Sequence, residues 1–275
     1  PTTPAPPEPD PTQRAVIDLL GDVTKADGVR YGAVDDRALP LDGLEIVESA
    51  PGAYVGIYHS LDAGMFRLKV ATSRDLLNWH WRADLDTSAA QGTIARAADG
   101  SYVVAYEKSA PNEVRLRFRG YDSLEALLTG AYSHEFTAPR TLAPTAEGTP
   151  NIESVDGMKV TLGFHYYRNA DVDRQARGVL TDFSSWSAEA APDLDALFEP
   201  FPIATQTAGG SRAFGNPTAT IVTAPSGKPR SSSRSSSSAR ARRPARRARS
   251  STFGFTDARV VAARRRLPDL PTQLL

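Results

Sequence analysis

Short runs of alternating apolar and polar residues fill the chain between about residue 30 and residue 228. β-Branched or aromatic residues stand at every second position of each run, and Pro-Gly, Asp-Gly or Pro-Asn pairs separate the runs. This pattern predicts strands over residues 54–59, 66–72, 102–107, 114–119, 159–166 and 176–181. We therefore expect the body of the protein to be all-β.

Two stretches have helical spacing instead. Apolar residues at 124, 127 and 128 form one face of a short helix between Asp122 and Gly130. Glu125 stands three residues after Asp122, which gives a start like a capping box, and Gly130 is a typical stop. A second short helix is expected over residues 15–20.

An internal repeat predicts how the strands are arranged. Gly92, Gly148 and Gly215 each open a unit in which a polar residue, a strand, a turn and a second strand follow, and a weaker copy of the unit starts at Gly43. The four glycines are 49, 56 and 67 residues apart, a spacing that fits four-stranded propeller blades. A β-sandwich is the alternative, but it gives no reason for the repeated glycine. The expected fold is an all-β β-propeller.

The chain divides into three parts. Residues 1–29 form a Pro/Thr-rich linker and a short helix, residues 30–228 hold the blades, and residues 229–275 are rich in Arg and Ser. Residues 229–250 contain no large apolar side chain, so we expect the last part to be disordered. It is a polyanion-binding tail, a solvated linker, or a frameshifted translation of a GC-rich gene. The third interpretation is favoured because the segment begins in the middle of a blade.

Charge separates the same parts. The whole chain has 32 basic and 32 acidic residues, but from Lys228 onward there are 13 basic and two acidic ones. The preceding residues are correspondingly acidic. No aromatic residue lies among the basic residues from 228 to 252, so the tail lacks a stacking platform for bases. We expect no nucleic-acid partner.

Several other classes are excluded by composition. The chain has no cysteine, and its four histidines lack the spacing of a helical zinc site. No apolar run is long enough for a membrane span, so we expect no membrane association. The first residue is Pro rather than Met, which indicates processing, and a Pro/Thr-rich linker favours a secreted, extracellular protein. We expect a monomer.

One segment resembles a known family. Ser73, Asp75, Leu76 and Trp79 follow the pattern S-x-D-L-x-x-W found at the outer edge of blades in five-bladed propeller glycoside hydrolases, notably family 43. Residues 181–186 are a looser copy that ends at Trp186. The resemblance implies five blades, the last of them incomplete here, and structural roles for both tryptophans.

The resemblance also implies candidate catalytic residues. The segment containing Glu147, Gly148 and Pro150 is similar to the family's E-G-P context, which implies that Glu147 is the general acid. Glu153 is a rival, because period two would place it on the same face of the strand as Glu147. The family's base is an Asp near the first blade, for which Asp36 and Asp42 are candidates. The family's D-P motif is absent.

Other residues suit a sugar-binding cleft. Candidates for substrate binding are His59, His165, Tyr166, Arg212 and Asn216. The alternatives are polar strand ends for the histidines and a surface-loop position for the arginine. Gln91 occupies the position of the family's third carboxylate, and Glu107 is interpreted as a structural or rim residue.

The function implied by the resemblance is a secreted glycoside hydrolase of arabinofuranosidase or xylosidase type. It would act on polysaccharide or oligosaccharide with inversion, using a Glu acid and an Asp base. The alternative is a non-catalytic carbohydrate-binding β-propeller, in which aromatics and amides rather than carboxylates converge. We expect a carbohydrate partner and no cofactor, although the resemblance allows a structural calcium on the propeller axis.

Overall fold

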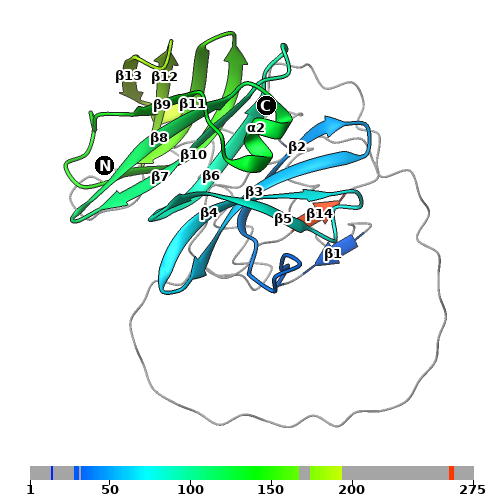
Figure 1. Ribbon diagram of the computed structural model, residues 1–275. Coiled ribbons are helices and arrows are strands. Elements are labelled where there is room, and N and C mark those ends of the chain that lie inside the picture. Colours follow the sequence, from blue (N-terminus) through cyan, green and yellow to red (C-terminus); the bar gives the residue numbers. More distant parts are fainter. Residues whose placement is uncertain (1–13, 15–27, 31, 167–173, 194–259, 263–275) are drawn as a thin grey trace, which may run out of the picture.

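A computed structural model describes residues 14, 28–30, 32–166, 174–193 and 260–262. Three four-stranded antiparallel sheets make up most of this part (Figure 1). The first contains β2 (Asp42–Ala50), β3 (Ala53–Asp62), β4 (Met65–Ser73) and β5 (His80–Thr87). The second contains β6 (Ala89–Arg96), β7 (Tyr102–Ala110), β8 (Glu113–Tyr121) and β9 (His134–Thr137). The third contains β10 (Glu147–Asp156), β11 (Lys159–Tyr166), β12 (Arg174–Thr181) and β13 (Ser185–Ala190).

These sheets are blades 1, 2 and 3 of a β-propeller. Within each sheet the strands follow one another in chain order, as in a meander. The first strands of the three sheets, β2, β6 and β10, lie against one another and are therefore the innermost strands. The all-β propeller class is confirmed. The predicted fourth and fifth blades would lie largely in residues 194–259, outside the described residues.

All six predicted strands are confirmed, as β3, β4, β7, β8, β11 and β12. The sequence pattern did not reveal the outer strands β5, β9 and β13, whose side chains are mostly exposed or half-buried. The helix α2 (Leu124–Thr129) is present and ends at Gly130, which has a left-handed φ of 74°. Its N-cap is Ser123 rather than Asp122, because the Ser123 hydroxyl accepts the N–H of Ala126.

The glycosidase-like signature of blade 1 has the structural role expected of it. The Asp75 carboxylate accepts the N–H groups of Leu77 and Asn78 at 2.9 and 2.8 Å, which holds the turn between β4 and β5. Leu76 and Trp79 are buried in the core of the blade. In blade 3, Trp186 lies within β13 rather than in a turn.

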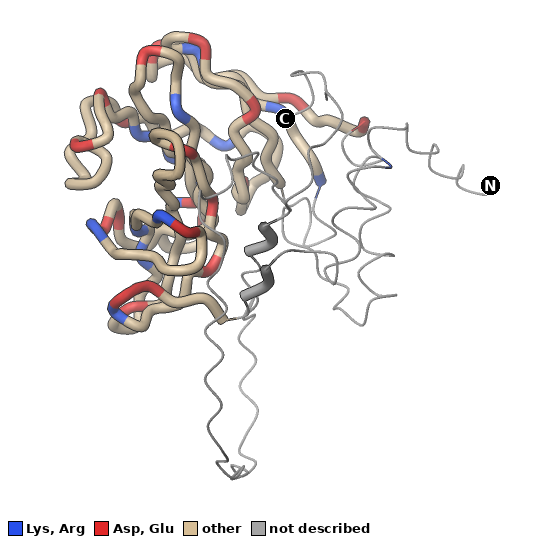
Figure 2. Tube along the Cα trace, turned by 90° about the vertical axis from the view of Figure 1, so that its right-hand side faces the viewer, with Lys and Arg blue, Asp and Glu red and all other residues tan. Residues whose placement is uncertain are grey.

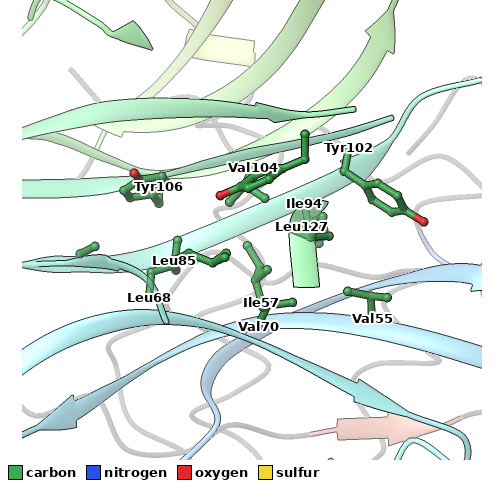
Figure 3. Close-up of a cluster of buried hydrophobic side chains, with 12 residues drawn as sticks. Val55, Ile57, Leu68, Val70, Leu85, Ile94, Tyr102, Val104, Tyr106 and Leu127 are labelled. Carbon is green, nitrogen blue, oxygen red and sulfur yellow. The ribbon is translucent and has the colours of Figure 1, made fainter. Parts of the chain in front are cut away.

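The core lies between neighbouring blades. Figure 3 shows the cluster in which Ile57, Leu68 and Val70 of blade 1 face Ile94 and Val104 of blade 2. The two blades approach closely at a glycine of β6. A Cβ atom added there, at Gly92, would lie 2.7 Å from a methyl carbon of Leu68 and 2.9 Å from one of Ile57. A second cluster joins blades 2 and 3.

Each innermost strand begins with the same irregularity. The strand register shifts between Asp42 and Glu45, between Ala90 and Thr93, and between Gly148 and Asn151. Each shift contains one residue with a left-handed backbone: Gly43 (φ 60°), Gln91 (φ 46°) and Thr149 (φ 49°). These three residues are structurally equivalent. The left-handed residue stands one position before the repeat glycine in blade 2 and one position after it in blade 3, so an alignment on the glycines is wrong by one residue in both blades. Asp42, which precedes Gly43, therefore corresponds to Gly148 rather than to Glu147.

Two short strands lie apart from the blades. β1 (Gly28–Arg30) pairs antiparallel with β14 (Val260–Ala262). β14 belongs to the Arg/Ser-rich part of the sequence, whose other residues lie outside the described ranges. The expected helix over residues 15–20 also lies outside them.

Charged residues of both signs are interspersed over the three blades (Figure 2). No helix in the described part of the chain is both long enough and apolar enough to cross a membrane.

Candidate functional site

One end of the three blades gathers polar side chains from different strands. We call this end, at which β2, β6 and β10 begin, the mouth. The second strand of each blade ends here, and its last residues pair with the start of the innermost strand. His59 pairs with Asp42, Glu107 with Ala90, and His165 with Gly148. His59, Glu107 and His165 therefore occupy equivalent positions in blades 1, 2 and 3.

Two of these residues connect neighbouring blades. The Nδ1 atom of His59 accepts the backbone N–H of Gln91 in blade 2 at 3.3 Å. The Oε1 atom of Glu107 accepts the backbone N–H of Thr149 in blade 3 at 2.7 Å. In both cases the donor is the left-handed residue of the next blade's innermost strand. In blades 1 and 2, the same position thus fixes the start of the blade that follows.

Asp42 has the properties of a functional carboxylate. It is half-buried at the mouth, and burial raises its pKa above the ordinary value. The described residues give its carboxylate no hydrogen bond and no ion pair. As a cross-strand partner, His59 lies on the same face of the blade. A desolvated carboxyl group without a stabilising partner is a feature of functional sites rather than of structural ones.

His59 is buried beside Asp42 in its neutral form. Burial lowers the pKa of His59 to about 4. Its ring meets the ring of Phe66 edge-on, with 5.5 Å between centroids. A Cβ atom added at Gly43 would lie 3.2 Å from the His59 ring and 3.4 Å from the Oε1 atom of Gln91. Glycine at position 43 therefore leaves room for the side chains of two blades to meet.

Glu107 is held in place by blade 3. Besides the N–H of Thr149, its Oε1 atom accepts the hydroxyl of Thr149 at 2.9 Å. A Cβ atom added at Gly148 would lie 2.7 Å from the carboxyl carbon of Glu107, so any other residue there would displace the Glu107 side chain. Thr149 is β-branched and has a φ of 49°, a conformation that costs about 1–3 kcal/mol. Strained residues of this kind cluster at functional sites.

Glu147, the general acid expected from the sequence, makes structural contacts. Its side chain is buried, and its Oε1 atom accepts the backbone N–H groups of Thr141, Leu142 and Ala143 at 2.7, 2.5 and 3.1 Å. These bonds hold the loop that leads into β10. Its strand partner is Tyr166, a sugar-binding candidate that is buried in the apolar cluster between blades 2 and 3.

The two other predicted carboxylates lie elsewhere. Glu153 stands at a second register shift of β10, between Ile152 and Ser154. One shift lies between Glu147 and Glu153, and Glu153 stands within the second, so strict period-two alternation does not relate the faces of these two residues. Asp36 lies in the loop that precedes β2, where it is exposed and its carboxylate contacts the start of β5, the outermost strand of blade 1. The N–H of Trp81 bonds its carboxylate at 2.9 Å and lowers the pKa of Asp36. The structure does not bring Asp36 to the start of β2.

His165 is buried at the mouth position of blade 3. Arg212 and Asn216 lie outside the described residues. Sequence reasoning did not select Glu107 or Phe66 for the site. The signal that could have found Glu107 is its position at the end of the second strand of blade 2, where blades 1 and 3 carry His59 and His165.

The described residues contain no cluster of His, Asp and Glu side chains arranged to hold a metal ion.

The sequence matches no family model and no curated protein. Solved structures similar to the chain include a family 117 glycoside hydrolase from Zobellia galactanivorans, 13% identical with a TM-score of 0.42, over 61% of this chain and 62% of that one. An endo-arabinase from Bacteroides thetaiotaomicron is 12% identical with a TM-score of 0.42, over 54% of this chain and 60% of that one. A β-1,2-mannobiose phosphorylase from Listeria innocua is 9% identical with a TM-score of 0.41, over 51% of this chain and 40% of that one. The match spans less than two thirds of each of these proteins.

Proposed function

We propose that the protein binds carbohydrate at the mouth of the propeller and hydrolyses a glycosidic bond there. The observation that carries this proposal is Asp42, a half-buried carboxyl group with a raised pKa and no stabilising partner among the described residues. A raised pKa keeps a carboxyl group protonated at higher pH, as a proton donor to a leaving group requires. The surrounding backbone is bulged, and the side chains of His59 and Gln91 lie close to the neighbouring Gly43.

Glycoside hydrolysis needs a second carboxylate, and Glu107 of the adjacent blade supplies it. In this mechanism Asp42 donates its proton to the glycosidic oxygen as the bond from that oxygen to the anomeric carbon breaks. Glu107 accepts a proton from a water molecule whose oxygen attacks the same carbon from the opposite side. Inversion by this route requires roughly 6.5–9.5 Å between the two carboxyl groups.

This assignment differs from the one that the family resemblance implies. Three N–H bonds to one oxygen of Glu147 favour a structural role for that carboxylate. The Asp36 carboxylate bonds His80 and Trp81 of the outermost strand, which leaves Asp42 as the better supported aspartate. We keep the substrate class implied by the resemblance, a polysaccharide or oligosaccharide containing arabinofuranosyl or xylosyl units. We also propose that the protein is secreted, which would give it access to polysaccharide outside the cell.

One observation favours the alternative of a carbohydrate-binding propeller without catalysis. Glu107 and Glu147 both use carboxylate oxygens to bond backbone N–H groups of neighbouring loops and strands. If Glu107 and Glu147 serve only to stabilise the fold, Asp42 has no second catalytic carboxylate beside it. The two functions differ in whether bound sugar is cleaved.

The test is an activity screen with aryl arabinofuranosides and aryl xylosides, followed by oligosaccharides. Asp42→Asn and Glu107→Gln should each lower kcat by about 10²–10⁴-fold, the usual contribution of an acid or base. Glu125→Gln, on the exposed side of α2, is the matched control and should retain full activity. Proton NMR of the first product formed would show the inverted anomer. Sugar binding without cleavage would favour the non-catalytic alternative, and neither binding nor cleavage would overturn both.

A further inference from the structure

The hairpin between β3 and β4 carries an unusual concentration of exposed apolar side chains. Its two turn residues, Ala63 and Gly64, both have left-handed backbones, with φ of 52° and 78°, as in a tight type I′ turn. Just outside the turn, Leu61, Met65 and Phe66 are 57%, 41% and 45% exposed. They make up half of the large hydrophobic residues exposed in the described part of the chain. Scattered exposed apolar residues need no explanation, but a cluster of them does.

Strand register shows which of these side chains face the site. Leu61 pairs with Phe66, and His59 pairs with Leu68 on one side and Asp42 on the other. Because side chains alternate along a strand, Leu61, Phe66, His59 and Asp42 share one face of blade 1. Met65 belongs to the opposite face.

That shared face is turned toward blade 2. Leu68 and Ile57, which lie on the same face, reach Gly92 of β6. His59 bonds the N–H of Gln91, the residue before it. Phe66 and Leu61 continue this face beyond the start of the innermost strand, so they border the mouth on the side of blade 1.

We propose that Phe66, together with Leu61, forms a platform on which a sugar ring stacks beside Asp42. The Phe66 ring lies 5.5 Å from the ring of His59, the cross-strand partner of Asp42. A sugar ring has an apolar face of C–H groups and an edge of hydroxyl groups. The apolar face would cover Phe66, while the hydroxyl groups would reach the polar side chains of Asp42 and Gln91.

The size of the platform favours a sugar over a protein partner. One aromatic and one aliphatic side chain offer the area of a single ring, whereas a stable protein interface buries on the order of 1,000 Å² or more. A small-molecule site combines apolar walls with a few polar groups. The platform has the same combination, because a desolvated carboxyl group and other polar residues of the mouth lie beside it. The platform is a subsite of the proposed hydrolase and rests on that proposed function.

The test uses titration calorimetry with arabino- and xylo-oligosaccharides of increasing length, and chromatography of the same samples to detect cleavage. Phe66→Ala should weaken binding about three- to tenfold, the value of one aromatic stacking contact. Phe66→Trp should retain or strengthen binding. Met65→Ala, on the opposite face of the same hairpin, is the matched control and should bind as the wild-type protein does. Thermal unfolding of each variant checks that the blade is intact.

The outcomes separate the two proposals. If the wild-type protein binds or cleaves oligosaccharide and Phe66→Ala does so equally well, the platform is wrong and the proposed function stands. If binding depends on Phe66 but no product forms, the platform stands and hydrolysis does not. If Met65→Ala weakens binding as much as Phe66→Ala, the effect comes from the hairpin as a whole, and the platform is again overturned.

Discussion

The carboxylate of Glu107 accepts both the backbone N–H and the hydroxyl of Thr149, at 2.7 and 2.9 Å. A residue of blade 3 therefore helps to orient a side chain of blade 2. Thr149 keeps a backbone conformation that is costly for a β-branched residue, which indicates that the contact with Glu107 and the surrounding strands impose it.

The first prediction concerns this contact. Thr149→Val retains the shape of the side chain but removes the hydroxyl, so Glu107 should lose orientation, and kcat should fall about tenfold, since a misplaced catalytic group is costly. Thr149→Ser keeps the hydroxyl and should restore most of the activity. Steady-state kinetics over a range of pH measures both. Equal activity of the Val and Ser variants would show that the hydroxyl has no part in catalysis.

The second prediction separates Glu147 from Asp42 by stability. Glu147→Gln weakens three hydrogen bonds to a charged acceptor and should lower the free energy of unfolding by about 1.5–3 kcal/mol. Asp42→Asn removes a desolvated carboxyl group and should leave stability unchanged or higher. Urea unfolding measures both, with Glu153→Gln as a control at a half-buried bulge. A stable, inactive Glu147→Gln protein would instead restore Glu147 as the general acid.

The third prediction is a loss of stability in acid that depends on His59. Its pKa is about 4 when folded and near 6.5 when unfolded, so the unfolded chain binds the proton more tightly. The stability contribution is fully present above pH 6.5 and is lost as the pH falls from 6.5 to 4, by about 3 kcal/mol at most. The raised pKa of Asp42 acts in the opposite direction, since the folded state then takes up the proton more readily.

His59→Gln provides an acceptor for the N–H of Gln91 but does not titrate, so its unfolding free energy should change less between pH 7.5 and pH 4. His134→Gln, at an exposed position of β9, is the control and should keep the wild-type acid dependence. An unchanged acid dependence of the His59 variant would contradict the assignment.

The fourth prediction tests how closely the first two blades are packed. Gly92→Ala adds a methyl group at 2.7 Å from Leu68 and 2.9 Å from Ile57, and overpacking of this kind costs about 1–3 kcal/mol. Gly52→Ala is the comparison. Its site is open but has a φ of 69°, so it should lose only about 1 kcal/mol through backbone strain. Thermal unfolding compares the two, and a smaller loss for Gly92→Ala would show that the blades can separate to accept the methyl group.

Period-two alternation was sufficient to predict the second and third strands of every described blade, because one or both of their faces are buried. It did not reveal β5, β9 and β13, since these outer strands keep polar side chains on exposed faces. The unit length indicated propeller blades, because each blade repeats one meander and so repeats its turns.

The candidate site was harder to predict from the sequence than the strands were, and Gln91 and Thr149 show why. A left-handed backbone is usually signalled by glycine, and these two residues adopt it without being glycine. Aligning the blades on glycines therefore shifted blades 2 and 3 by one residue. Along β10, two register shifts also broke the alternation on which the pairing of Glu147 with Glu153 depended. Bulges are set by contacts between strands, which no single strand's pattern contains.

The short ladder between β1 and β14 has a kinetic consequence. Each blade is built from hairpins whose strands are neighbours in sequence, whereas Gly28–Arg30 and Val260–Ala262 come from opposite ends of the chain. Contacts between distant segments form slowly, because a long loop must first be closed. We therefore expect the blades to form before this ladder does, and hydrogen exchange at its amides to be faster than in the blade interiors.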